Sequence, residues 1–252
     1  MEYKNNTIKQ MILEIRFPVL LSINSEAPSE LQERIREYFP IYNLKIDNSQ
    51  DFNYDKDSNS FVSNSDSIKR INNYEFITND GKTKIVLTYN SFSISTIKYE
   101  NWNNIIRIFE MPLKEFLNIY NINKVDRVGL RYIDVFSKKE LNITECMWKD
   151  LINNKWIGIL ANIEENRIKN NWQNYEYFLN EDDSIAKIGI GLGKLNNNDE
   201  IVFISDSDFI CNINVEAERI NDIANSLHIN AKNFYDNLIL DRLKKALIPI
   251  EQ

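Results

Sequence analysis

The alternation of apolar and polar residues along the chain predicts β-strands in its first half. In Met11–Phe17, apolar residues alternate with Glu14 and Arg16, the pattern of a strand with one buried face. The same pattern, separated by turn-forming residues, predicts an antiparallel meander and one later strand, at Tyr74–Thr78, Lys84–Tyr89, Phe92–Tyr99 and Val125–Phe136.

Helical periodicity predicts a second set of elements. A helix over Asn101–Tyr120, capped by its first residue, should be kinked or split by Pro112. A shorter helix is expected over Ser29–Phe39, and a long terminal helix from about Arg219 to Ala246. The segment Asn48–Asp66 is rich in Asn, Ser and Asp and predicts an exposed loop.

The second half of the chain has a similar order of elements. After a short helix, five strands are expected before the terminal helix, at Gly158–Ile163, Tyr175–Leu179, Ile185–Leu195, Glu200–Ser205 and Phe209–Val215. Because a meander followed by a long helix occurs twice, the pattern predicts an α+β fold of two related lobes, residues 1–140 and 141–252. Each lobe is expected to be a curled antiparallel sheet packed against a long helix, and the two to form one compact unit.

Composition narrows the function classes. The 252 residues carry a net charge of -7, which argues against broad affinity for nucleic acid or for anionic membranes but leaves room for a local basic patch. The polar N-terminus lacks a signal-peptide pattern, and the apolar run 17–21 is too short to span a bilayer. A cytoplasmic protein with no membrane association is expected.

Metal and cofactor chemistry has little support in the composition. There is one histidine, and the two cysteines, Cys146 and Cys211, lie far apart, which excludes sites built from several His or Cys ligands. We expect free buried thiols in a reducing compartment, with no bound metal and no cofactor.

The segment Asp126–Asp134 is the most distinctive in the chain. On a strand, Arg127, Gly129 and Arg131 share one face, so two guanidinium groups can grip a carboxylate or phosphate. Tyr132 and Lys194 are further candidates for binding such an anion. The alternative is that each arginine pairs with an acidic neighbour across the sheet.

Four weaker candidates lie in the second half. Asp206 and Asp208 have a spacing found in some metal sites, but turn formation also explains them. His228, on the flank of the terminal helix, lacks an identifiable nucleophile and is expected to bond a backbone carbonyl or solvent. Trp172, close to Tyr175, has the character of a base-stacking residue or of an ordinary hairpin edge.

Glycines at 189, 191 and 193 precede Lys194. Their spacing does not fit a phosphate-binding loop, which needs four residues between its glycines and a Ser or Thr after the lysine. At period two they lie on one face of a strand, where another backbone, a helix or a ligand comes close. Simple packing is the favoured interpretation.

Several of these segments together resemble a family of uncharacterised bacterial proteins of similar length and sporadic distribution. The matching pieces, in order, are Ile12–Phe17, Tyr99–Trp102, the hallmark Arg-Val-Gly-Leu-Arg-Tyr-Ile-Asp at 127–134, Asp206–Asp208, and Leu227–His228 with Phe234. The family commonly carries Asn or Asp at the last hallmark position. The resemblance implies one full-length unit, brings no catalytic residues or cofactors, and through its patchy distribution suggests mobile elements such as phage-defence or toxin–antitoxin loci.

The favoured hypothesis is a non-enzymatic binding or regulatory module of such a system, acting through a protein partner encoded nearby or as a homodimer. One alternative is an enzyme on phosphate-containing substrates, in which Arg127 and Arg131 would converge with His228 and the two aspartates. Another is binding of single-stranded nucleic acid on a concave sheet, through a local patch or a partner.

Overall fold

Two strands far apart in sequence, β1 (Ile8–Arg16) and β9 (Arg127–Phe136), pair at the centre of one antiparallel sheet. The computed structural model describes residues 3–49, 52–55, 60–63, 69–168, 170–179, 184–195, 200–212 and 214–250. Within them nine strands form this sheet, in the order β10-β11-β12-β9-β1-β7-β6-β5-β2. The other seven are β2 (Ile41–Ser49), β5 (Lys69–Ile77), β6 (Thr83–Leu87), β7 (Ser91–Thr96), β10 (Trp172–Phe178), β11 (Ile185–Lys194) and β12 (Ile201–Cys211).

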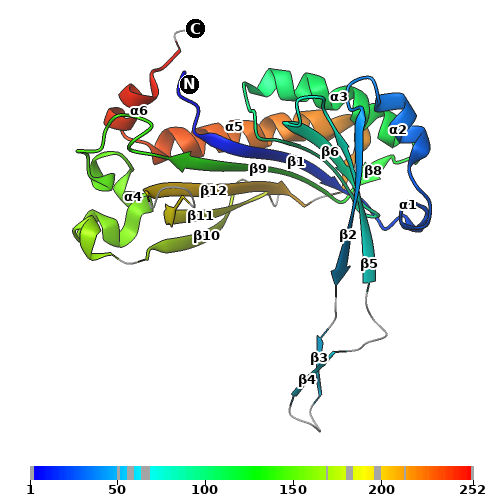
Figure 1. Ribbon diagram of the computed structural model, residues 1–252, viewed down its shortest axis with the longest axis horizontal. Helices are drawn as coiled ribbons and strands as arrows, with labels where there is room; N and C mark the ends of the chain where they lie inside the picture. Colours follow the sequence, from blue (N-terminus) through cyan, green and yellow to red (C-terminus); the bar gives the residue numbers. More distant parts are fainter. Residues whose placement is uncertain are drawn as a thin grey trace.

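The long helices α3 (Trp102–Ile119) and α5 (Ile220–Leu238) lie on the same face of the sheet (Figure 1). Their buried apolar side chains pack on those of the strands, as where Phe92 of β7 stacks on Phe116 of α3 with ring centroids 4.4 Å apart. The remaining helices are α1 (Leu21–Ser25), α2 (Ser29–Ile35), α4 (Asn154–Ile157) and α6 (Asp241–Leu247), with short 3-10 turns at Trp148–Asp150, Gly158–Ala161, Glu165–Arg167 and Ala217–Arg219. None of the described helices is long and apolar enough to cross a membrane.

The start of α3 confirms its predicted cap. The side chain of Asn101 accepts a hydrogen bond from the backbone N–H of Asn104 at 2.9 Å. The expectation that Pro112 splits the helix is wrong, because α3 continues through it. Proline removes one backbone donor, and Pro112 lies on the buried face of α3 together with Phe109, Leu113 and Phe116, so packing on that face offsets the lost hydrogen bond.

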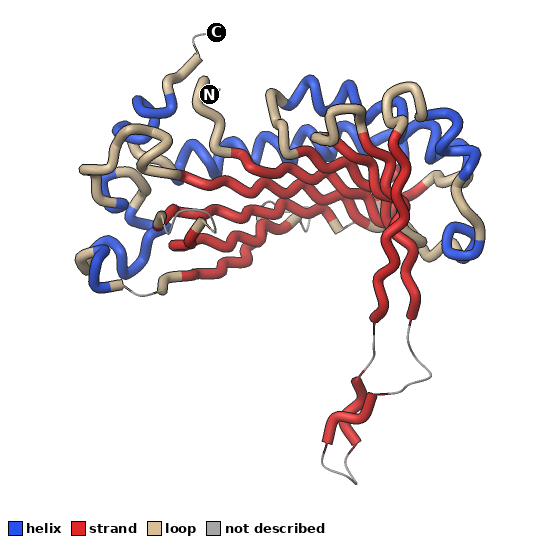
Figure 2. Tube along the Cα trace, in the orientation of Figure 1, coloured by secondary structure: helices blue, strands red, loops and turns tan. Residues whose placement is uncertain are grey.

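The strands β2 and β5 form an arm that projects from the rest of the sheet (Figures 1 and 2). They pair over Ile41–Ser49 and Lys69–Ile77, whereas β6 pairs with β5 only over Tyr74–Ile77. Beyond them, β3 (Phe52–Asp55) pairs with β4 (Ser60–Ser63). The loop predicted for 48–66 is therefore wrong in part: backbone hydrogen bonds between strands form even where the sequence lacks the apolar content to pack.

Two further predictions in the second half are corrected. The strand predicted at 158–163 is a 3-10 turn following α4, where Gly158 has a φ of 53°. The terminal helix ends at Leu238, because Ile239 is extended and bridges to Ile152, and α6 starts at Asp241. Cys146 and Cys211 are buried free thiols, as predicted.

The fold is α+β, as predicted, but both halves of the chain share one sheet. β9 pairs with β1 on one side and with β12 on the other. Each half therefore continues the hydrogen-bond ladder of the other, and the prediction that each half curls into its own sheet is wrong. A further pair, β8 (Lys124–Val125) with β13 (Val215–Glu216), also joins the two halves.

Candidate functional site

Strand β9 distributes the hallmark segment between two faces of the sheet. Arg127 and Arg131 point to the face opposite α3 and α5, where both are part-buried. Tyr132 and Asp134 point to the helix-covered face and are buried. Because side chains alternate along a strand, one segment contributes to two separate surfaces.

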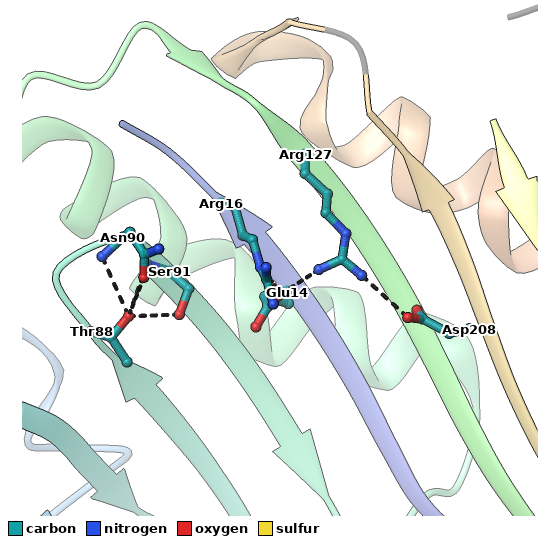
Figure 3. A network of polar contacts seen from close by, with 7 residues as sticks. All are labelled: Glu14, Arg16, Thr88, Asn90, Ser91, Arg127 and Asp208. Carbon is teal, nitrogen blue, oxygen red and sulfur yellow. Dashed lines mark hydrogen bonds and ion pairs between the residues drawn. The ribbon is translucent and has the colours of Figure 1, made fainter. Parts of the chain in front are cut away.

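The arginine face, defined by Arg127 and Arg131, is neutralised by carboxylates. Arg127 forms ion pairs with Glu14 of β1 at 2.6 Å and with Asp208 of β12 at 3.2 Å (Figure 3). Arg131 binds both oxygens of Asp206, at 2.6 and 2.5 Å. The arginines thus pair with acidic neighbours across the sheet, the alternative considered from sequence, and anion binding by them stays a prediction.

Asp206 and Asp208 lie in the middle of β12, so their interpretation as a turn is wrong. The strand is continuous over Ile201–Cys211, and each carboxylate bonds one arginine of β9. Burial raises the pKa of Asp208, although Arg127 and Arg131 lower it. Among the described residues, no group of three or more His, Cys, Asp or Glu side chains is placed to hold a metal ion.

The glycine-rich strand β11 accommodates its neighbour β10. A Cβ on Gly191 would lie 2.0 Å from the backbone oxygen of Asn171, and one on Gly189 would lie 2.9 Å from the ring of Trp172. The predicted close approach of another backbone is thus confirmed at Gly191. Lys194 is exposed at the end of β11.

Trp172 and Tyr175 do not share a surface. Trp172 is 44% exposed, and its indole N–H donates to the side chain of Asn174 at 3.1 Å. An odd spacing places Tyr175 on the other face of β10, where its ring packs edge-on against Trp156. The two rings therefore cannot stack successive bases along one groove.

A pocket of about 150 Å³ lies on the helix-covered side, where the N-terminal segment, β9 and α5 meet. The N-terminal segment is fixed there because the backbone N–H groups of Lys4 and Asn5 donate to the backbone carbonyls of Ile248 and Leu247, respectively. Its lining includes six side chains with polar groups that are discussed below: Tyr3, Thr7, Tyr132, Asp134, His228 and Tyr235. We call it the Asp134 pocket.

Asp134 is the most deeply buried acid of this pocket, with 3% of its surface exposed. Its Oδ1 accepts a hydrogen bond from the hydroxyl of Thr7 at 2.6 Å. Since that bond uses the Thr7 proton, the Tyr235 hydroxyl, 3.0 Å away, donates to Thr7. Burial raises the pKa of Asp134 to about 7, against a lowering by the Thr7 hydrogen bond, so the carboxyl is partly protonated near neutral pH.

His228 forms another wall of the pocket. Its Nδ1 is 2.9 Å from the Tyr132 hydroxyl, and its ring stacks on Trp102 at 4.5 Å, with 8° between the planes. Burial, and then the charge of Lys232, lower the pKa of His228 to about 4. The histidine is therefore neutral at pH 7, and its side-chain partner is a tyrosine rather than the backbone carbonyl or solvent expected from sequence.

The arginine face and the Asp134 pocket lie on opposite sides of the sheet. Arg127 and Arg131 therefore do not converge with His228. The alternative of an enzyme on phosphate-containing substrates requires that they do. Tyr132 and His228 are candidates from the sequence, whereas Asp134, Thr7 and Tyr235 emerge as pocket residues only from the structure. One signal was available, because Asp134 occupies the same strand face as the apolar Val128 and Leu130.

The arginine face provides a first prediction. Changing Arg127 to Ala removes the cation that bridges Glu14 and Asp208, in a setting where the arginine side chain is only 17% exposed. Glu14 then keeps only its ion pair with the more exposed Arg16, at 2.8 Å. We expect the free energy of unfolding to fall by about 2 to 3 kcal/mol in urea titrations. Arg34→Ala is the matched control: Arg34 also contacts two carboxylates but is 47% exposed, so the loss of stability should be clearly smaller than for Arg127→Ala. Equal losses would contradict the importance of burial here.

No protein-family model matches the chain, and comparison with curated proteins gives no match either.

Proposed function

We propose that this chain is a binding and regulatory module rather than an enzyme, with the Asp134 pocket as its small-molecule site. In this proposal it serves a bacterial mobile-element or phage-defence type system and acts through a protein partner or through self-association. The biological setting rests on the resemblance of residues 127–134 and the accompanying segments to the sporadically distributed family.

The observation that carries the proposal is the preformed state of the pocket. Thr7 joins Asp134 to Tyr235, and Tyr132 contacts His228, so these polar groups are held by one another. A concave site with a few fixed polar groups and a perturbed carboxyl is typical of ligand binding. A histidine with a pKa of about 4 is a weak base at neutral pH, so His228 is poorly suited to general-base catalysis there.

The arm supports contact with another protein chain. β2 is an edge strand of the sheet, and it carries four exposed apolar side chains, Ile41, Tyr42, Leu44 and Ile46. Edge strands offer unpaired backbone groups to a further strand, and exposed apolar groups strengthen such contacts.

We also infer that the two halves of the chain are related. In each half a long strand is followed by helical segments, a meander and a helix, and the last meander strand pairs with the first strand, β7 with β1 and β12 with β9. The antiparallel pairing of β1 with β9 is consistent with an approximate two-fold relation between the halves. No sequence identity is needed for this inference, which rests on topology.

The pocket assignment is tested by blocking it. Ala231 of α5 is buried and lines the pocket, so Ala231→Phe fills it, whereas Ile229→Phe on the exposed side of α5 is the matched control. In a thermal-shift screen of small metabolites, we expect compounds that raise the Tm of the wild type and the control by about 2 °C or more, but not that of Ala231→Phe.

The compounds should be recovered chemically unchanged. A screen in which no compound separates the two variants, or in which a compound is turned over, would overturn the proposal. If Ala231→Phe does not unfold cooperatively, Ala231→Met provides the same comparison with a smaller change in volume.

A further inference from the structure

The buried carboxyl of Asp134 has few partners: one hydrogen bond and no ion pair within the described residues. Among the described residues, only the Thr7 hydroxyl donates a hydrogen bond to this carboxyl, at Oδ1, and none forms an ion pair with it. A buried carboxylate without a partner of opposite charge is costly. The pocket beside it therefore favours a ligand that brings N–H donors or positive charge.

The walls of the pocket suit such a ligand. Five aromatic side chains line it: Tyr3, Tyr99, Tyr132, Phe234 and Tyr235. Tyr3 and Tyr235 form a tilted pair with centroids 6.1 Å apart, and Tyr99 meets Tyr132 edge-on at 5.6 Å. Aromatic rings attract cations to their faces. The buried hydroxyl of Tyr3 has no hydrogen-bond partner within the described part of the chain.

Size and charge at the pocket limit the ligand further. A cavity near 150 Å³ accommodates about one six-membered ring. Lys232 and Glu100 also line the pocket, but both are exposed and Glu100 forms an ion pair with Lys98, so solvent screens their charges more than that of the buried Asp134. The preference of the pocket for a cationic over a neutral or anionic ligand therefore depends mainly on Asp134.

We propose that the Asp134 pocket binds a small planar organic cation, an amidinium or guanidinium group, with Asp134 as its counter-ion and the tyrosines around it. Such a group presents two parallel N–H donors that match the two oxygens of a carboxylate. This inference rests on the proposed function, since it names the ligand class of the same pocket.

The test uses three ring compounds of nearly equal shape and different charge. Benzamidinium is the cation, benzamide the neutral isostere and benzoate the anion, each titrated into the full-length chain by calorimetry near pH 8. We expect benzamidinium to bind at least about ten-fold more tightly than benzamide, and benzoate not to bind.

Two carboxylate variants locate the effect. Asp134→Asn is expected to weaken benzamidinium binding about ten-fold or more, because it removes the counter-ion and keeps the shape. Asp206→Asn, which removes a carboxylate from the opposite face of the sheet, should leave the affinity unchanged. Blocking the pocket with Ala231→Phe should abolish binding.

Proton release is an independent readout. Near pH 6.5, a cation that binds the ionised carboxylate expels the proton that Asp134 holds, so the measured enthalpy should depend on the ionisation enthalpy of the buffer; near pH 8.5 this dependence should vanish. The other titratable or charged groups that line the pocket are Tyr3, Tyr99, Glu100, Tyr132, His228, Lys232 and Tyr235, and Asp236 of α5 acts on Tyr3 and Tyr235 from outside the lining. In the Asp134→Asn variant, where these remain, the buffer dependence should be lost.

The outcomes separate the ligand class from the pocket itself. If benzamide or benzoate binds as tightly as benzamidinium and Ala231→Phe blocks it, the cation inference fails while the pocket function stands. If benzamidinium binding is indifferent to Asp134→Asn, or if none of the three compounds binds, the cation inference is overturned. The thermal-shift comparison of Ala231→Phe with Ile229→Phe then decides the proposed function separately.

Discussion

Replacing Asp134 by Asn is expected to stabilise the protein at alkaline pH and to leave its stability almost unchanged in mild acid. The folded-state pKa of Asp134 is about 7, against about 3.9 for an aspartate in an unfolded chain. Between these values the folded state holds a proton that the unfolded state has lost. The free energy of unfolding therefore falls as the pH rises from about 4 to about 7.

Ionising the buried carboxyl of Asp134 lowers the free energy of unfolding. The pKa difference of about three units sets this loss at no more than about 4 kcal/mol above pH 7. Asparagine keeps an oxygen that can accept from Thr7 and carries no charge at any pH. We therefore expect Asp134→Asn to be more stable than the wild type by about 2 to 4 kcal/mol at pH 8, and to differ by less than about 1 kcal/mol at pH 4.5.

Urea titrations of both proteins from pH 4 to pH 8.5 measure this difference. His228 has the opposite sign, because its lowered pKa means that stability is lost as the pH falls through the range from about 6.5 to about 4. Taking the difference between variant and wild type at each pH removes the contribution of His228 and of Asp208. A difference that stays constant across the pH range would rule out titration of Asp134 as its cause.

The central part of the fold was predictable because local patterns decide it. Alternation along β1, β9 and the meander identifies strands without knowledge of their partners, and Asn101 marks the start of α3. The sequence pattern divides β12 into two strands, because Asp-Ser-Asp is typical of a turn when its neighbours in space are unknown. Its continuity depends on Arg127 and Arg131, whose side chains pair with those carboxylates from another strand.

The pocket was predictable only in part, for a related reason. Thr7 and Tyr235 are separated by 228 positions, and nothing local in the sequence indicates that they meet at Asp134. The sequence indicates both Tyr132 and His228 as candidates, but as members of different sites. What joins them is the packing of α5 on β9, a tertiary contact that periodicity alone does not specify.

Substituting Gly191 by Ala is expected to destabilise the protein strongly, although Ala is normally preferred to Gly within a strand. An added Cβ would lie 2.0 Å from the carbonyl oxygen of Asn171 and 2.8 Å from the Cα of Trp172, both backbone atoms. That carbonyl accepts the N–H of Leu192 at 2.8 Å, so moving it also breaks a hydrogen bond. We expect the free energy of unfolding to fall by about 3 kcal/mol in urea titrations.

Gly189→Ala is the matched control, two residues away on the same face of β11. Its Cβ would meet the ring of Trp172 at 2.9 Å and the side chain of Asn174 at 3.3 Å. Both are side chains of the edge strand β10 and both are exposed, so they can move aside, and the loss should remain below about 1 kcal/mol. Equal losses in the two variants would show that the backbone of β10 moves away from a new methyl group as easily as its side chains do. In that case hydrogen exchange should find the amides of β10 and β11 opening well below the global free energy of unfolding.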